Sequence, residues 1–234
     1  MVNHIHPSAV VGDGVELGDG ITIGPGAVVL GPCVVGDGTW IGPGCVIGTP
    51  PEITSAEHNR AWDGSLAHAG VHIGARVVIR ELSTVHQGSS RATTIGADSW
   101  LLNRVYVAHD SLVGSGVTLS AGVSLGGHVQ IGDKVNVGMN AAVHQRRVIG
   151  AGAMIGMGTP VSKDVPPFAR AYGSPIRAHG VNSVGMSRSG VSDAAIEALT
   201  SAYEAGQLPS EIPAELEVAF KWWTEAEAAK PLVG

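Results

Sequence analysis

The chain has 234 residues, of which 44% are hydrophobic and 15% charged, and its formal net charge is −6. It can therefore fill a buried core, and its acidic balance argues against nucleic acid or an anionic membrane surface as a partner. The start carries no basic region followed by an apolar stretch, and no run of about 18 apolar residues occurs, so we expect a cytoplasmic protein without a membrane span. Only Cys33 and Cys45 are present, and we interpret them as reduced core thiols.

An apolar residue recurs at every sixth position from near the N-terminus onward. The first block has eight such positions, at Ile5, Val11, Leu17, Ile23, Val29, Val35, Ile41 and Ile47. A six-residue period fits neither a helix nor a two-sided sheet. It is typical of the hexapeptide repeats of a parallel β-helix, in which each hexad forms one short strand and one corner. Three hexads, or about 18 residues, would then complete one coil.

The six-residue register breaks twice. Residues 49–71 include two adjacent prolines and scattered polar residues, and residues 88–94 form a shorter interruption. We interpret both as excursion loops that leave the coil at a corner. Three hexads lie between the loops, and twelve follow them, at Ile95, Leu101, Val107, Val113, Leu119, Leu125, Ile131, Val137, Val143, Ile149, Ile155 and Val161. The sequence therefore predicts an all-β solenoid over residues 1–165.

The repeat ends at two consecutive prolines, which cannot donate to a strand ladder. We expect residues 166–234 to form a mainly helical C-terminal domain. Ser192 is a candidate N-cap for a helix that ends at Gly206, and a second helix is predicted at about 214–229. Two short helices cannot enclose a core of their own, so we expect their apolar faces to pack on the solenoid or on a neighbouring subunit.

Three histidines fall on one edge of the predicted solenoid. Adjacent coils lie about 4.8 Å apart, so residues near 18 or 36 apart in sequence stack on the same wall. His109, His128 and His144 have this spacing, and Asp110 adjoins the first of them. A histidine beside a carboxylate can act as a general base, although any single corner histidine can instead bind a neighbouring loop. A metal site is not favoured, because no close pair of histidine ligands and no Cys/His cluster is present.

Several short motifs carry a family resemblance. They are Ile79-Arg-Glu-Leu-Ser-Thr-Val-His86, Val107-Ala-His-Asp110, Gly126-Gly-His128, Ala142-Val-His-Gln145, Asp164-Val-Pro-Pro167 and Gly180-Val-Asn182. At these spacings the chain resembles the acyl-(acyl-carrier-protein):UDP-N-acetylglucosamine O-acyltransferases of the lipid A pathway. The resemblance implies a left-handed coil, an exception to the usual crossover handedness, and a homotrimer with its active sites between subunits.

The resemblance also implies roles for individual residues. His109 would be the catalytic base, Asp110 its orienting acid, and the N–H of Gly127 the donor that stabilises the oxyanion. Substrate-binding residues would be Tyr106, His128, His144, Gln145, Asn182 and Arg188. The reaction implied is direct transfer of an acyl chain from the phosphopantetheine thioester of acyl-carrier protein to a hydroxyl or amine of a UDP-linked amino sugar. It needs no other cofactor, no metal and no covalent acyl-enzyme.

The chain departs from the family on the acceptor side. The family holds its sugar with an Asp and a Lys at the start of the first loop, where this chain has Pro, Glu, Ile, Thr and Ser. Tyr106 replaces a histidine, Ser189 replaces the second of two tail arginines, and Arg146 and Arg147 replace an aromatic and a small residue. A related acyltransferase with another nucleotide sugar or a specialised metabolite as acceptor, and with acyl-CoA as donor, therefore stays open. A non-catalytic or metal-dependent trimer is the third possibility.

A column of side chains bears on the acyl chain. Ala121, Met139 and Met157 are 18 residues apart and should stack on one wall. In the resembling family, glycine stands at the positions of the two methionines in enzymes that accept long chains, and a bulky residue at the second position stops the hydrocarbon. Met139 and Met157 therefore predict a short or medium acyl chain. Alternatively, both methionines fill the trimer interface.

Overall fold

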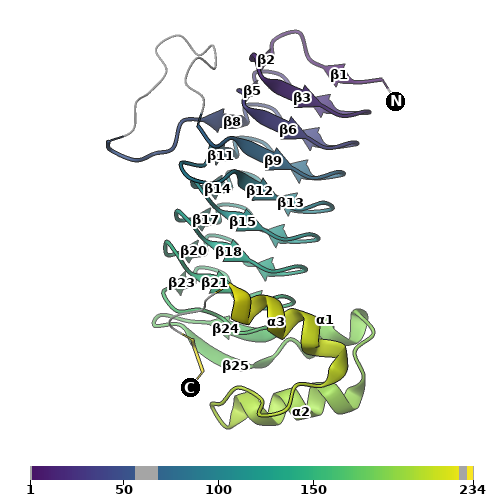
Figure 1. Ribbon diagram of the computed structural model, residues 1–234, viewed down its shortest axis with the longest axis vertical. Coiled ribbons are helices and arrows are strands. Elements are labelled where there is room, and N and C mark those ends of the chain that lie inside the picture. Colours follow the sequence, from purple (N-terminus) through teal and green to yellow (C-terminus); the bar gives the residue numbers. More distant parts are fainter. Residues whose placement is uncertain (1, 56–67, 227–230, 234) are drawn as a thin grey trace.

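Figure 1 shows a computed structural model of the protein, which describes residues 2–55, 68–226 and 231–233. The chain winds as a β-solenoid, with the N-terminus at one end of the stack of coils and the helices at the other (Figure 1). Each hexad contributes one short strand. In β14 (Tyr106–Val107), for example, the second residue is fully buried and the first faces outward. The predicted hexapeptide register is therefore confirmed.

The strands form three sheets, which we call sheets A, B and C. In spatial order, sheet A contains β1 (His4–Ile5), β4 (Thr22–Ile23), β7 (Trp40–Ile41), β10 (Val78–Ile79), β13 (Trp100–Leu101), β16 (Thr118–Leu119), β19 (Asn136–Val137), β22 (Met154–Ile155), β24 (Ala169–Tyr172) and β25 (Arg177–Val181). Sheet B contains β2 (Val10–Val11), β5 (Val28–Val29), β8 (Val46–Thr49), β11 (Thr84–His86), β14, β17 (Ser124–Leu125), β20 (Ala142–Val143) and β23 (Pro160–Val161). Sheet C contains β3 (Val15–Leu17), β6 (Cys33–Val35), β9 (Val71–Ile73), β12 (Thr93–Ile95), β15 (Leu112–Val113), β18 (Gln130–Ile131) and β21 (Val148–Ile149).

Residues 18 apart in sequence lie side by side on the sheets. Tyr106 pairs with Ser124, and Ser124 pairs with Ala142, in parallel register. Because the chain visits sheets A, B and C in turn, the solenoid has three edges made of turns. We call them the A–B, B–C and C–A edges after the strands that each turn joins.

The two breaks in the repeat are insertions at these edges. The first follows β8 and ends at β9, and its residues 56–67 lie outside the described part of the chain. The second lies between β11 and β12, so it belongs to the B–C edge. It comes one coil before the turn that carries His109.

Sheet A continues beyond residue 165 in a way that the sequence did not predict. Strand β24 pairs in parallel with β22, and β25 then turns back antiparallel to β24. The pairing joins Met154 to Arg170, an offset of 16 residues instead of 18, so the hexad period no longer marks the strand. The six-residue period therefore cannot predict this hairpin.

The C-terminal helices are α1 (Ser183–Arg188), α2 (Asp193–Glu204), the 3-10 helix η1 (Ala214–Leu216) and α3 (Glu217–Glu225). Ser192 caps α2 as predicted, with its side chain accepting a hydrogen bond from Ala195 N. The second predicted helix is divided into η1 and α3, and residues 227–230 of its expected range lie outside the described residues. Helix α2 packs on β25, and the Tyr203 hydroxyl donates to Pro167 O at 2.7 Å. The helices thus cover the end of the solenoid.

Two further expectations concern the core and the membrane. Cys33 and Cys45 are both buried and unpaired, and burial raises the pKa of Cys33 to about 12 and also raises that of Cys45. Among the described helices, none has the length and apolar character that crossing a membrane requires.

Candidate active site

Successive turns of the B–C edge bring the predicted catalytic residues together. His109 and Asp110 follow β14, Gly127 and His128 follow β17, and His144 follows β20. His128 N donates to His109 O at 3.0 Å, which ties neighbouring turns to each other. The structure therefore places the three histidines on successive coils of one edge.

Asp110, His128 and Arg146 occupy the same position in these turns. Their φ angles are 59°, 60° and 61°, in the left-handed region that non-glycine residues seldom adopt. A turn with this backbone at each coil aims the three side chains in one column. These three residues, each 18 from the next in sequence, therefore stack in one column at the B–C edge.

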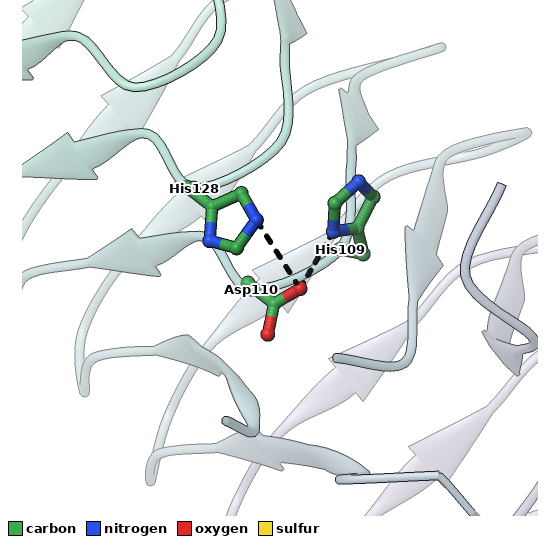
Figure 2. A group of neighbouring side chains, drawn as sticks. All are labelled: His109, Asp110 and His128. Carbon is green, nitrogen blue, oxygen red and sulfur yellow. Dashed lines mark hydrogen bonds and ion pairs between the residues drawn. The ribbon is translucent and has the colours of Figure 1, made fainter. Parts of the chain in front are cut away.

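His109 and Asp110 form the tightest contact of the edge (Figure 2). His109 Nδ1 lies 2.6 Å from Asp110 Oδ2, and the side chains are 14% and 0% exposed. An ionised carboxylate can only accept, so Nδ1 carries a proton, and in the neutral ring Nε2 keeps its lone pair. This tautomer leaves Nε2 available as a base.

The environment of Asp110 favours its ionised form. Burial raises the pKa of this carboxyl, but hydrogen bonds from the Ser89 side chain, from His109 and from the Arg91 and Ser90 backbones hold the pKa well below its usual range. The sequence predicts residues 88–94 only as an excursion loop. Their place one coil before His109 on the same edge was the signal that could have linked them to Asp110.

His128 completes the group shown in Figure 2. Its Nε2 lies 3.8 Å from Asp110 Oδ2, and its ring stands edge-on to that of His109 with centroids 5.1 Å apart. Burial lowers the pKa of His128 and outweighs the attraction of Asp110, and the cations Arg146 and Arg91 lower it further. His128 is therefore a neutral ring near pH 7, which donates a hydrogen bond at one nitrogen and accepts at the other.

Gly127 lies directly against the imidazole of His109. A Cβ at this position would lie 2.6 Å from His109 Nε2, so only glycine lets the ring approach the next coil this closely. Gly127 is buried, and within the described part of the chain its N–H donates to no protein acceptor. Nε2 of His109 thus lies against a residue whose N–H has no protein acceptor among the described residues.

His144 and Gln145 lie further along the same edge and are exposed. His144 Nδ1 is 3.0 Å from Gln145 O, an arrangement in which Nδ1 donates and Nε2 is free to accept. Their turn lies two coils beyond the turn of His109 on the B–C edge.

Tyr106 belongs to a second polar group, on the outer face of sheet B. Its ring meets that of His86 edge-on at 5.4 Å, and burial and a hydrogen bond to Glu52 raise the pKa of its hydroxyl. His86 Nδ1 in turn lies 2.9 Å from Pro50 O. The start of the first excursion loop therefore packs on sheet B beside the B–C edge. The sequence did not predict this contact.

The remaining predicted site residues lie on other edges of the same chain. Asn182 caps α1 and donates to Gly152 O at 2.9 Å, which places it at the C–A edge, and Arg188 is exposed at the end of α1. Met139 and Met157 lie on the A–B edge and are 46% and 69% exposed. Within one chain the width of a sheet separates these residues from His109.

The site also has the composition of a metal site. One ligand atom each from His109, Asp110 and His128 lie within 4.8 Å of one another. However, both oxygens of Asp110 already accept hydrogen bonds, from residues 89–91 and from His109. An ion would have to displace these donors, so the donor set fits proton transfer better than coordination.

A parallel solenoid of hexapeptide repeats with a His–Asp pair on one edge is the arrangement expected of a hexapeptide-repeat acyltransferase. A family model described as Udp N-acetylglucosamine O-acyltransferase, domain 2, matches residues 164–207. The acyl-(acyl-carrier-protein)–UDP-N-acetylglucosamine O-acyltransferase of Paraburkholderia phymatum is 37% identical over 219 residues, which cover 86% of this chain and 82% of that protein. The chain therefore belongs to the UDP-N-acetylglucosamine O-acyltransferase family and is an acyltransferase.

Solved structures of the family agree with this assignment. The UDP-N-acetylglucosamine O-acyltransferase of Moraxella catarrhalis has a TM-score of 0.77 at 28% identity, covering 98% of this chain and 99% of that one. The UDP-N-acetylglucosamine acyltransferase of Bacteroides fragilis has a TM-score of 0.75 at 30% identity, covering 98% and 90%. The similarity thus extends over the solenoid and the C-terminal helices.

Proposed function

We propose that this protein transfers an acyl chain from the thioester of acyl-carrier protein to a hydroxyl of a UDP-linked amino sugar, with UDP-N-acetylglucosamine as the first acceptor to test. The observation that carries this proposal is the arrangement around His109. Its Nδ1 is held by an ionised Asp110 at 2.6 Å, and its Nε2 lies against Gly127, whose N–H donates to no protein acceptor among the described residues. Membership of the family supports the same substrates.

The proposed chemistry is direct transfer. His109 Nε2 accepts the proton of the acceptor hydroxyl while the oxygen attacks the thioester carbonyl carbon. The Gly127 N–H donates to the oxyanion of the tetrahedral intermediate, and Asp110 stabilises the imidazolium. Collapse breaks the carbon–sulfur bond, and the departing phosphopantetheine sulfur takes the proton back from Nε2. The scheme needs no metal, no cofactor besides the donor's own phosphopantetheine, and no acyl-enzyme.

The proposed assembly is a homotrimer of left-handed β-helices, located in the cytoplasm. The argument for several subunits is that the residues assigned to substrate lie on different edges of one chain. The B–C edge would supply His128, His144 and Gln145, with Tyr106 beside it. The other edges of neighbouring subunits would supply Asn182 and Arg188 for the nucleotide and Met139 and Met157 for the acyl chain. Two unpaired cysteines agree with a reducing compartment.

A second candidate function changes the acceptor. Glu52, at the start of the first loop, forms a hydrogen bond with Tyr106. The family that the chain resembles has other residues at both positions. This polar group favours an acceptor other than UDP-N-acetylglucosamine, either another nucleotide sugar or a specialised metabolite, and acyl-CoA could then replace acyl-carrier protein.

A two-stage experiment separates the candidates. A thermal-shift panel of UDP-sugars and other nucleotide sugars identifies the acceptor, because a ligand that binds only the folded protein raises the melting temperature. The best acceptor is then incubated with acyl-(acyl-carrier-protein) or acyl-CoA, and the product is identified by mass spectrometry. The proposal expects UDP-N-acetylglucosamine to give the largest shift and an O-acylated product from the carrier-protein thioester. A larger shift and faster acylation with a different acceptor would replace it by the second candidate.

A further inference from the structure

A tight turn at residues 88–92 encloses the carboxylate of Asp110. On one side, Ser89 donates to Oδ2 through its backbone N at 3.1 Å and its Oγ at 2.6 Å. On the other side, Oδ1 accepts from Ser90 N at 2.8 Å, Ser90 Oγ at 2.9 Å and Arg91 N at 2.9 Å. With His109 Nδ1, six donors surround one carboxylate. A carboxylate offers about four lone-pair sites, so these six donors use its acceptor capacity fully.

The turn is shaped and anchored for this contact. A Cβ on Gly88 would overlap the carbonyl oxygen of Arg91, so the chain can fold back this sharply only at glycine. Gly88 also pairs with Gly70, donating to its carbonyl at 3.0 Å. Arg91 Nε donates to Asp110 O at 2.8 Å, which fixes the backbone as well as the side chain of Asp110. The turn therefore holds the whole residue in place.

The two serines lie at the surface, whereas Asp110 is completely buried. Their hydroxyls are thus positioned to act on the carboxylate without being part of the core. A hydroxyl in such a position stabilises the ionised carboxylate and fixes its rotamer. Each hydroxyl also reduces the negative charge that the Asp110 carboxylate presents to His109.

We propose that Ser89 and Ser90 are positioning residues of the acyl transfer, whose hydroxyls hold Asp110 so that His109 keeps its proton on Nδ1 and presents Nε2 to the acceptor. The inference rests on the proposed role of His109 as the base. Orientation is one half of the effect, since a small misplacement of a catalytic group can cost about a hundredfold in rate. Charge is the other half, because donors on the carboxylate limit how strongly it stabilises the imidazolium.

Other charged or titratable groups also face the pair. His128 and Arg146 stand on the following coils, Arg91 lies in the turn, and the group of Glu52, His86 and Tyr106 lies on the adjoining sheet B. All of them stay unchanged when only the serines are replaced. A change in pH behaviour can therefore be assigned to the two hydroxyls.

The kinetic test compares the parent with Ser89→Ala/Ser90→Ala in the full chain, using the acyl donor and acceptor at a series of pH values. We expect kcat to fall at least about tenfold with both KM values nearly unchanged. The acidic limb of the kcat/KM profile should move to higher pH, because a carboxylate with fewer donors attracts the imidazolium more strongly. Ser89→Thr/Ser90→Thr keeps both hydroxyls and should restore the parent profile. Ser115→Ala, an exposed serine on the C–A edge, is the matched control.

A spectroscopic readout works without turnover. We expect the His109 Nδ1–H proton, in its short contact with Asp110, to give a downfield resonance that can be assigned by its loss in His109→Ala. We expect it to shift or broaden in the double alanine variant and to stay in place in the threonine and Ser115→Ala variants. The proposal is overturned if this resonance matches that of the parent, or if turnover is measurable and the acidic limb does not move. Absence of acyl transfer in the parent would count against the proposed function, while the resonance would still test the serines.

Discussion

Arg147 and Asp164 form an ion pair inside the wall of the solenoid. Arg147 Nη1 lies 3.1 Å from both carboxylate oxygens, and the side chains are 10% and 1% exposed. Asp164 also accepts from Val148 N at 2.8 Å, and its carbonyl accepts from Leu232 N. Arg147, which replaces a small residue of the family, thus has a buried partner for its charge. It fastens the B–C edge to the segment after β23 and to the end of the chain.

Arg147→Ala should therefore destabilise the protein by about 3 kcal/mol, because removing one partner leaves the other charge buried. The midpoint of urea denaturation, followed by circular dichroism, measures the loss. Arg76→Ala is the matched control, since Arg76 pairs with Asp98 at 2.6 Å where both side chains are more than half exposed. Water screens that pair, so its loss should matter far less. Equal losses of stability in the two variants would show that the buried Arg147–Asp164 pair stabilises the fold no more than the exposed pair does.

Acid should remove the contribution of Asp110 to stability. The pKa of this carboxyl is lower in the folded than in the unfolded chain, so the enclosed carboxylate stabilises the fold above the unfolded value of about 4. That stabilisation is lost as the pH falls from about 4 toward the folded value. We expect the difference in unfolding free energy between the parent and Asp110→Asn to be largest near pH 7 and to shrink below about pH 4. Urea denaturation at a series of pH values measures this difference. A difference in unfolding free energy that stays constant with pH would contradict the prediction.

Met157→Gly should lengthen the preferred acyl chain. If the exposed Met157 stops the hydrocarbon, its removal opens room for further methylenes, each contributing about 0.8 kcal/mol of burial, or about fourfold in kcat/KM. A series of acyl-carrier-protein thioesters of increasing length measures the preference. Met154→Gly, on the outer face of sheet A, is the control. A preferred chain no longer than that of the parent would instead favour methionines that only fill a subunit interface.

The solenoid was predictable because each coil depends mainly on its neighbours. One buried apolar residue per hexad, such as Val107 in β14, sets the register, and the 18-residue pairing follows without knowledge of distant contacts. The same arithmetic placed His128 beside His109. The spacing alone could therefore predict the centre of the candidate site.

The surroundings of the site did not follow from the spacing. The hydrogen bonds from Ser89 to Asp110 depend on the path of a loop, and the contact of Glu52 with Tyr106 on the return of another loop. Neither loop follows the six-residue period, so the spacing of residues cannot predict its course. Strand β24 was not predicted because its pairing offset differs from the repeat. The capping role of Asn182 was not predicted because helix α1 is too short to show a periodic pattern.

The most direct test of the account is the turnover of His109→Ala, measured as thiol release from the acyl donor in the presence of acceptor. Without the base, kcat should fall at least about a hundredfold while circular dichroism and the melting profile show a folded protein. His144→Ala should fall much less, because His144 lies exposed further along the edge. A folded His109→Ala variant with near-parental turnover would contradict the account, since proton transfer would then have to come from another group.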